Sequence, residues 1–503
     1  MSYRLYPVSG KELSCDEYRV FVEGKEVVCD AARVSAYPIN RRWPGRQRQI
    51  EQTELVNFLS LAIDGPITVE IFPKEPFERV EIRPKRANIS HRITERGSIV
   101  LTLEKPEYFT VEPYGRNRAL HIFADPMPAY DVSPDDESVI YYGAGVHEAG
   151  TVELKSGQTL FLDEGAVVYA CVKASCAENI RILGRGILDN SHNKEQILFE
   201  AHEENNASAV NNAKRQHTVQ LEYCKNVEID GITIRDSLVY NIRPMACTNL
   251  TIRNVKIIGC WRFNSDGIDM HNCENVLIEH CFIRTFDDCI CVKGFDCYQA
   301  GDVEQAVYAA MHYGGGNYEN FRHVRVRGCV LWNDWGRCLE IGAETRAEEI
   351  TDVLFEDCDV IHVTSAVLDC YNVDYADVHD ITYRNIRIEL DEEQRKGMIQ
   401  QTDDQTYVNV DPEFVPPLLC SRVIFHYEYS AGGARRGRNR DILFEDIDII
   451  GRQKPRFVFE AHSEEACNRN IVMRNIRHNG RKLTSPEDYT LECGEYCYGI
   501  RLE

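Results

Sequence analysis

The sequence predicts an all-β protein, in which a β-sandwich domain at residues 1–129 precedes a right-handed parallel β-helix at residues 130–503. Short strand-like runs alternate apolar and polar residues, and no helical stretch separates them. From about residue 178 onward, an Asn or Asp followed by such a run recurs. A repeat of 20 to 30 residues holding several short strands is typical of stacked coils of parallel sheet.

The first part of the chain predicts the sandwich because its strand-like runs follow no fixed period. Breaks such as Asp64-Gly65-Pro66 and Lys74-Glu75-Pro76 separate these runs, and Ala124-Asp125-Pro126-Met127-Pro128 reads as a linker. The expected strands are Tyr18–Val22, Ile67–Ile71, Val80–Ile82, Ser98–Leu103 and Ala119–Phe123.

The second part predicts the coils. Asn226, Asn249 and Asn275 open successive repeats, 23 and 26 residues apart. Three intervals near double length carry insertions, at about 190–216, 295–320 and 391–438, and long loops in a solenoid are often functional walls. The aromatic and Gly-rich segment Tyr308–Tyr318 is the most suggestive of these.

Charge limits the partners. The 503 residues hold 57 Lys and Arg against 80 Asp and Glu, a formal net charge of −23. A field of that sign repels nucleic acid and anionic membranes, so we expect neither as a partner. A polyanionic substrate would need a local basic patch.

Cysteines and the N-terminus suggest a reducing location. Met1–Gly10 has no apolar signal-peptide core, and no run of about 18 apolar residues occurs, so we expect a cytoplasmic protein. Most of the twenty cysteines fall within or beside the strand repeats, which predicts reduced, buried thiols. Zinc is the weaker interpretation, because no CxxC pairs with another at ligand spacing. We expect no cofactor and no metal.

Two acidic clusters lie at equivalent places in successive repeats: Asn264-Ser265-Asp266-Gly267-Ile268-Asp269 and Phe286-Asp287-Asp288-Cys289-Ile290-Cys291-Val292-Lys293. Asp266 and Asp287 are 21 residues apart, close to one coil, so their carboxylates should stand about 4.8 Å apart on adjacent rungs. Like charges that close raise one pKa, which supplies an acid beside a base for glycosidic cleavage. The competing interpretations are turn-capping Asp residues and a calcium site.

These motifs resemble those of the polygalacturonase family of glycoside hydrolases and of its dextranase relatives. The family's Asn-Thr-Asp-Gly-Ile-Asp and Gly-Asp-Asp-Cys-Ile-Ala-Ile-Lys match the two clusters, and the resemblance covers about residues 140–480. It implies an inverting hydrolase in which Asp287 is the general acid, while Asp266 and Asp288 hold the attacking water. The preceding β-sandwich is more similar to the dextranase branch. Neighbouring rungs would by themselves favour the shorter carboxylate spacing of retaining enzymes.

Two departures from the family concern the substrate. The third family motif, Gly-His-Gly-Leu-Ser-Ile-Gly, reads Gly336-Arg337-Cys338-Leu339-Glu340-Ile341-Gly342, so Arg337 replaces the His. The fourth, an Arg-Ile-Lys that grips galacturonate, should fall near Ala366–Asn372, which contains no cation. We therefore expect a neutral oligosaccharide or polysaccharide, with Arg337 tuning the acids.

The remaining candidates would line the substrate groove. The aromatic candidates for stacking on sugar rings include Trp332 and Trp335, in addition to three aromatic residues among the substrate-binding residues given below. A pectin-acting polygalacturonase, a calcium-dependent polysaccharide lyase using Arg337 as base and a silent glycan-binding β-helix are the alternatives, and a homo-oligomer is compatible with each. The expected substrate-binding residues are Asn264, Asp269, Lys293, Arg337, Glu340, Trp261, Tyr240 and Tyr371.

Overall fold

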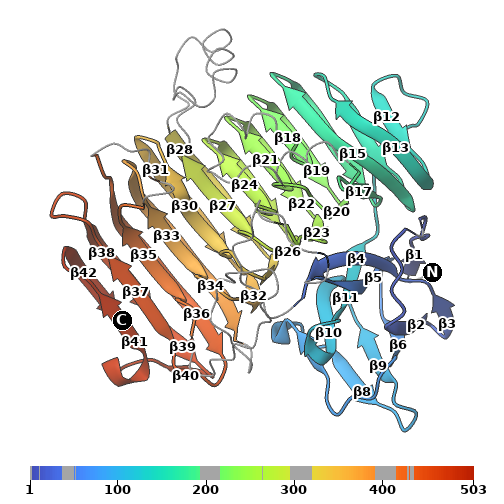
Figure 1. The fold of residues 1–503 in the computed structure, drawn as a ribbon, viewed down its shortest axis with the longest axis horizontal. Coiled ribbons are helices and arrows are strands. Elements are labelled where there is room, and N and C mark those ends of the chain that lie inside the picture. The colour runs from blue at the N-terminus through green and yellow to red at the C-terminus, as the bar shows by residue number, and fades with distance from the viewer. Residues whose placement is uncertain are drawn as a thin grey trace.

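The computed structural model describes residues 3–10, 12–36, 50, 53–192, 216–262, 264–294, 320–390, 415–426, 430 and 435–503. The three predicted insertions, including the segment 308–318, fall largely or wholly outside these residues. Within the described part, the chain is almost entirely strand, and a small domain stands beside one end of a long ladder (Figure 1). None of the described helices is long and apolar enough to cross a membrane.

The N-terminal domain is a sandwich of two sheets that enclose one apolar core. Strands alternate buried and exposed residues, as in β2, where Tyr18, Val20 and Val22 point inward. One sheet contains β1 (Tyr3–Leu5), β4 (Asp30–Ser35), β5 (Thr53–Ile63), β7 (Glu81–Arg83), β10 (Glu107–Arg116) and β11 (Leu120–Pro126), and the other contains β2 (Tyr18–Val22), β3 (Lys25–Val27), β6 (Ile67–Pro73), β8 (Ser90–Ile93) and β9 (Ile99–Leu103).

The rest of the described chain is a 31-stranded ladder whose strands pair in parallel with the next coil, apart from one short antiparallel pair near the C-terminus. The predicted fold class, a parallel β-helix after a β-sandwich, is confirmed. The predicted domain boundary stays a prediction, and it falls between β11 and β12 (Val139–Tyr142).

Three columns of strands form the coils. The column that carries the acidic motifs, here the catalytic column, contains β18 (Val219–Glu222), β21 (Ile242–Met245), β24 (Ile268–His271), β27 (Ile290–Gly294), β30 (Leu339–Thr345), β33 (Leu368–Asn372), β35 (Leu419–Val423), β37 (Arg456–Glu460) and β41 (Thr490–Cys493). A second column contains β14 (Thr159–Leu162), β16 (Glu178–Gly184), β19 (Lys225–Asp230), β22 (Thr248–Arg253), β25 (Glu274–Glu279), β28 (Asn320–Arg327), β31 (Glu349–Glu356), β34 (Asp377–Glu389), β36 (Arg438–Ile450), β38 (Asn468–Arg474) and β42 (Cys497–Leu502).

The third column faces the N-terminal domain. It contains β17 (Ile187–Asp189), β20 (Thr233–Arg235), β23 (Lys256–Ile258), β26 (Phe282–Thr285), β29 (Val330–Asn333), β32 (Asp359–His362) and β39 (Arg477–His478), and the long β13 (Gly145–Glu153) and β15 (Ala166–Ser175) open the ladder. Apolar residues of both domains, such as Phe58, Phe123, Phe282 and Trp332, form one buried cluster where they meet.

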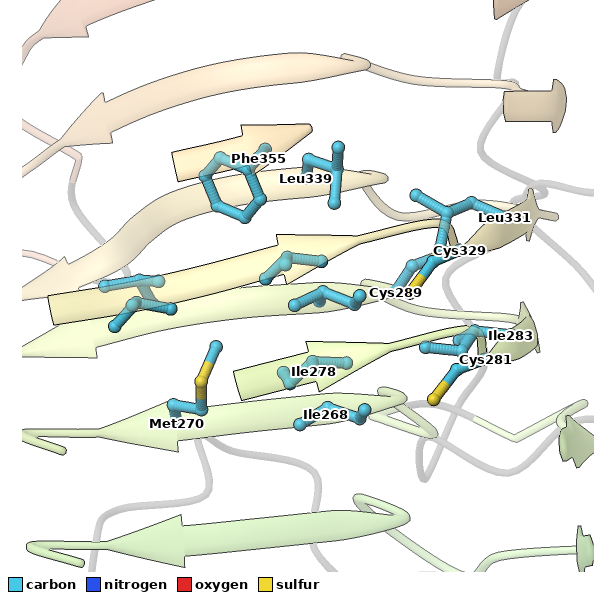
Figure 2. Close-up of a cluster of buried hydrophobic side chains, with 14 of the residues drawn as sticks. Ile268, Met270, Ile278, Cys281, Ile283, Cys289, Cys329, Leu331, Leu339 and Phe355 are labelled. Atoms are coloured by element: carbon cyan, nitrogen blue, oxygen red, sulfur yellow. The ribbon is translucent and has the colours of Figure 1, made fainter. Parts of the chain in front are cut away.

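Inside the coils, apolar side chains of neighbouring rungs stack on one another. Ile283 and Leu331 are partners on neighbouring rungs, and Cys281, Cys289 and Cys329 lie among the same apolar residues (Figure 2). The nineteen cysteines among the described residues are all free, and most are buried. Burial of most of the thiols is therefore confirmed, and their reduced state stays a prediction.

The Asn that opens each repeat has a structural reason. Asn179, Asn226, Asn249 and Asn275 all adopt a positive φ between 54° and 59°, a conformation that Asn tolerates better than most residues. The side-chain amides of Asn226, Asn249 and Asn275 each donate to the Asn one coil earlier, across 2.9 to 3.2 Å. This amide ladder joins successive coils at the turn and holds the strands that follow in register.

Candidate active site

The two acidic motifs meet at the N-terminal ends of β24 and β27. The backbone N–H of Gly267 donates to the carbonyl of Asp288 over 2.8 Å, which stacks the motifs on adjacent rungs. A Cβ at Gly267 would lie 2.3 Å from the carbonyl oxygen of Cys289, so only glycine fits this approach. The repeat thus places Asp266 beside Asp287 and Asp288, as the spacing predicted.

The three carboxyl groups form a tight and nearly dry cluster. One oxygen from each of Asp266, Asp287 and Asp288 lies within 4.8 Å of the others, and the residues are 2%, 8% and 6% exposed. Burial, reinforced by the charge of Asp288, raises the pKa of Asp287 to about 8. Burial and the neighbouring Asp269 raise the pKa of Asp266 well above its usual value. At neutral pH the cluster therefore retains at least one proton.

Backbone N–H groups orient two of the acids. Asn264 donates its N–H to Asp287 across 3.1 Å, and Arg337 donates its N–H to Asp288 across 2.7 Å. A Cβ at Gly336 would stand 2.6 Å from the Asp288 carboxylate, so this glycine lets the chain approach. Asp266 Oδ1 is buried and has no hydrogen-bond partner among the described residues, which leaves it available to a water molecule or a sugar hydroxyl.

The lysine flank is defined as Tyr240, Asp269, Lys293 and Glu344, which lie on or just before the successive strands β21, β24, β27 and β30. Lys293 Nζ stands 2.8 Å from Asp269, 3.5 Å from Asp266 and 3.6 Å from Glu344. Burial opposes its charge, but these carboxylates prevail and raise the pKa of Lys293. Its ammonium also lies 5.2 Å from the Tyr240 ring centre. The flank holds one deeply buried cation between three carboxyl groups.

On the side of the later coils lies the arginine flank, defined as Arg337, Glu340, Asp369, Tyr371 and Arg422. Arg337 pairs with Glu340 at 3.1 Å and with Asp369 at 3.2 Å, while Arg422 Nε donates to Asp369 across 3.3 Å. Both guanidinium carbons lie over the Tyr371 ring, 4.5 and 4.2 Å from its centre. Arg337 and Arg422 remain 21% and 17% exposed, whereas Glu340 and Asp369 are fully buried.

This flank corrects the sequence argument about charge. The segment 366–372 contains no cation, as predicted, but Arg422 reaches Asp369 in this segment from the next coil, so a cation missed by the sequence argument is present there. Tyr371 and Arg422 are register partners on β33 and β35. Arg422 lies inside the insertion predicted at about 391–438, but the structure shows that this segment contains β35, a strand of the coils, so motif spacing could not indicate the pairing.

The aromatic candidates divide into three groups. Tyr240 and Tyr371 lie on the flanks, as described above. Trp332 was wrongly expected in the groove: it is fully buried against the N-terminal domain, with Arg284 3.9 Å from its ring centre. Trp261 is 8% exposed and packs on Arg262, and Trp335 stacks on Phe286, so each has a packing partner beside the motifs.

In the part of the chain that the structure describes, two groups of side chains have donor atoms close enough for a metal ion: Asp266 with Asp287 and Asp288, and Asp288 with Cys291 and Glu340. The first already has Lys293 Nζ 3.5 Å from Asp266, a positive charge supplied by the protein. In the second, Glu340 is paired with Arg337. The lyase alternative needs calcium and a free base, and Arg337 is bound to two carboxylates, so the geometry favours acid and base chemistry by the aspartates.

Comparison with known proteins gives the following matches. The model of the family described as Glycosyl hydrolases family 28 matches residues 141–416. A probable polygalacturonase of Vitis vinifera is 35% identical over 86 residues, 17% of this chain and 18% of that protein. A polygalacturonase of Gossypium barbadense is 25% identical over 234 residues, 44% of this chain and 54% of that protein. The matches thus span about half or less of these relatives.

Among solved structures, Dex49A from Penicillium minioluteum is similar over 99% of this chain and 96% of that chain. The TM-score is 0.61 and the sequence identity is 14%. At this identity the likeness concerns the fold alone, and it includes the N-terminal domain as well as the coils.

Proposed function

Since the chain belongs to glycosyl hydrolase family 28, we propose that it hydrolyses a glycosidic bond in an oligosaccharide or polysaccharide, using Asp266, Asp287 and Asp288. The predicted resemblance to this type of hydrolase is confirmed by the family match. The observation that carries the proposal is the buried cluster of three carboxyl groups, in which the pKa of Asp287 is raised to about 8. Such a group holds a proton at neutral pH beside carboxylates able to accept one.

In the proposed reaction, Asp287 protonates the glycosidic oxygen as the bond to the anomeric carbon breaks. Asp266 and Asp288 orient a water molecule and accept its proton as its oxygen attacks from the opposite face, so the anomeric configuration inverts. Lys293, 3.5 Å from Asp266, favours the ionised form of that carboxyl group as it takes up this role. The proton given and the proton received balance within the cluster.

Stereochemistry tests the role of the water. Proton NMR during the first minutes of hydrolysis should show the anomer opposite to that of the cleaved bond. Retention would instead indicate that Asp266 or Asp288 attacks the sugar directly, which the short separation of the carboxyl groups would accommodate.

We propose a neutral substrate, or one whose charge lies away from the cleaved sugar. Both arginines of the arginine flank are engaged by Asp369, and Arg337 also by Glu340, so neither guanidinium is free to clamp a carboxylate. The second candidate is a polygalacturonase activity, which the partial exposure of Arg337 and Arg422 side by side favours. The net charge of −23 opposes it.

A parallel assay separates the two. Polygalacturonate and its short oligomers are compared with neutral oligosaccharides of galactose, rhamnose, arabinose and glucose, from pH 4 to 8. Release of neutral sugars with little galacturonate supports a neutral substrate. Efficient release of galacturonate would instead support the polygalacturonase activity. A product with near-ultraviolet absorbance would indicate a lyase.

A further inference from the structure

A chain of one backbone hydrogen bond and two ion pairs leaves the acid cluster and crosses three later coils. Asp288 accepts the N–H of Arg337, the Arg337 side chain pairs with Asp369, and Asp369 pairs with Arg422. The members come from the segments at β27, β30, β33 and β35, which are consecutive neighbours in the catalytic column. The chain of contacts therefore joins Asp288 to a residue that does not touch it.

Arg337 is the member on which the geometry of Asp288 depends. Its N–H is the donor to the carboxylate, so any rotation of the peptide between Gly336 and Arg337 moves that hydrogen bond. Its side chain is fixed at the other end by Asp369, which is fully buried and shared with Arg422. Two contacts of Arg422 with Asp369, from Nε and Nη2, lock the orientation of the shared carboxylate.

We propose that Arg422 is a positioning residue for hydrolysis, an inference that rests on the proposed function. Through Asp369 and Arg337, Arg422 holds the Asp288 carboxylate in place beside Asp287. Arg422 itself does not act on the bond that breaks. The bidentate contact is the element that a lysine cannot reproduce, because an ammonium offers a point charge in place of a planar fork.

Asp287 reports on this arrangement. Burial first, and then the charge of Asp288, raise the pKa of Asp287 to about 8. If the Asp288 carboxylate swings away or water enters, both causes weaken and the pKa of Asp287 falls toward its ordinary value. The charged and titratable groups that act on this pair of carboxyl groups are Asp266 and Asp269 from the preceding coil, Cys291 and Lys293 on β27, and Arg337, Cys338 and Glu340 from the following coil.

The test variant is Arg422→Lys, which keeps the positive charge and removes the fork. The matched control is Arg456→Lys on β37, one coil further on, where Arg456 makes a bidentate pair with Glu492 and also donates to the carbonyl of Val415. Full-length protein carrying carbon-13 in its Asp carboxyl groups is titrated by NMR, and Asp287→Asn assigns the resonance of Asp287. This measurement needs no substrate.

We expect the midpoint of the Asp287 titration to move down by about one pH unit in Arg422→Lys and to stay in place in Arg456→Lys. On the sugar that the wild type cleaves fastest in the panel, kcat should fall about tenfold with KM unchanged. An unmoved Asp287 midpoint would overturn the inference, and so would a raised KM at constant kcat, because Arg422 would then grip the substrate.

The proposed function fails by a different result. If Asp287→Asn hydrolyses every active sugar at the wild-type rate, the assignment of the acid is wrong whatever Arg422 does. If that variant is inactive and Arg422→Lys shifts nothing, only the positioning chain is wrong.

Discussion

The lysine flank and the arginine flank border the same three aspartates but hold their cations in different ways. Lys293 is 6% exposed and is surrounded by Asp266, Asp269 and Glu344, one charge for three carboxyl groups. On the arginine flank, two guanidinium groups share Asp369, and both keep an exposed edge. The first arrangement serves charge balance in a dry site, and the second provides geometry together with a surface that a sugar can reach.

The largest expected effect comes from the acid that both flanks border. Asp287→Asn should lower hydrolysis of a substrate with a poor leaving group by roughly 10²–10⁴-fold, because that oxygen needs a proton as it departs. An aryl glycoside with a good leaving group should lose less. Initial rates on both substrates measure this, and equal losses would argue that Asp287 is not the acid.

The matched variants Asp266→Asn and Asp288→Asn should lower the rate of hydrolysis of both substrates to the same extent, because these residues are proposed to activate water. A near-normal rate in either would remove it from that role.

Removing the buried cation should break the lysine flank. Lys293→Met leaves the fully buried Asp269 without its partner, and breaking a buried pair costs about 3–5 kcal/mol of unfolding free energy. Arg337→Met should cost less, because its guanidinium is partly exposed and Arg422 still binds Asp369. Urea denaturation of both variants checks the order, and equal losses would erase the contrast between the flanks.

The proton on Asp287 predicts a pH dependence of stability. Its pKa is raised on folding to about 8, so its contribution to stability is fully present below the unfolded value and is lost as pH rises through about 8. Catalysis should decline above about pH 8, because the acid then loses its proton. Denaturation between pH 5 and 9 should show the fall in wild type and a weaker fall in Asp287→Asn, and parallel curves would contradict the assignment.

The smallest effect tests the aromatic of the arginine flank. Tyr371→Leu removes the ring over which both guanidinium groups lie, a cation–π contribution of about 0.5–1 kcal/mol each at partly exposed positions. The change should loosen Arg337 and Arg422, so kcat should fall by less than in Arg422→Lys and the pH profile should move slightly down, with KM unchanged. Tyr240→Leu offers the comparison on the lysine flank, where a shifted profile is expected because Lys293 lies close to Asp266.

Features that recur in each repeat could be predicted from the sequence, whereas contacts made from within a predicted insertion or between the two domains could not. The Asn positions recur because each turn needs a positive φ and an amide neighbour, so the coils could be followed by eye. Asp266 and Asp287 came together because stacked coils turn a sequence interval into a distance. Arg422 could not be assigned, since its strand β35 lies inside the segment predicted as an insertion. Trp332 failed for another reason: strand periodicity gives no sign of which outer face a second domain covers.

The reactivity of the free cysteines inside the coils can report on local unfolding of individual rungs. Cys224, Cys247, Cys273 and Cys329 sit on different rungs and are inaccessible in the folded state, whereas Cys493 is exposed. A thiol reagent should therefore modify Cys493 at once and each buried thiol only when its own rung opens. Mass spectrometry of the labelled peptides over time would show whether the ladder frays from its ends or opens as one unit.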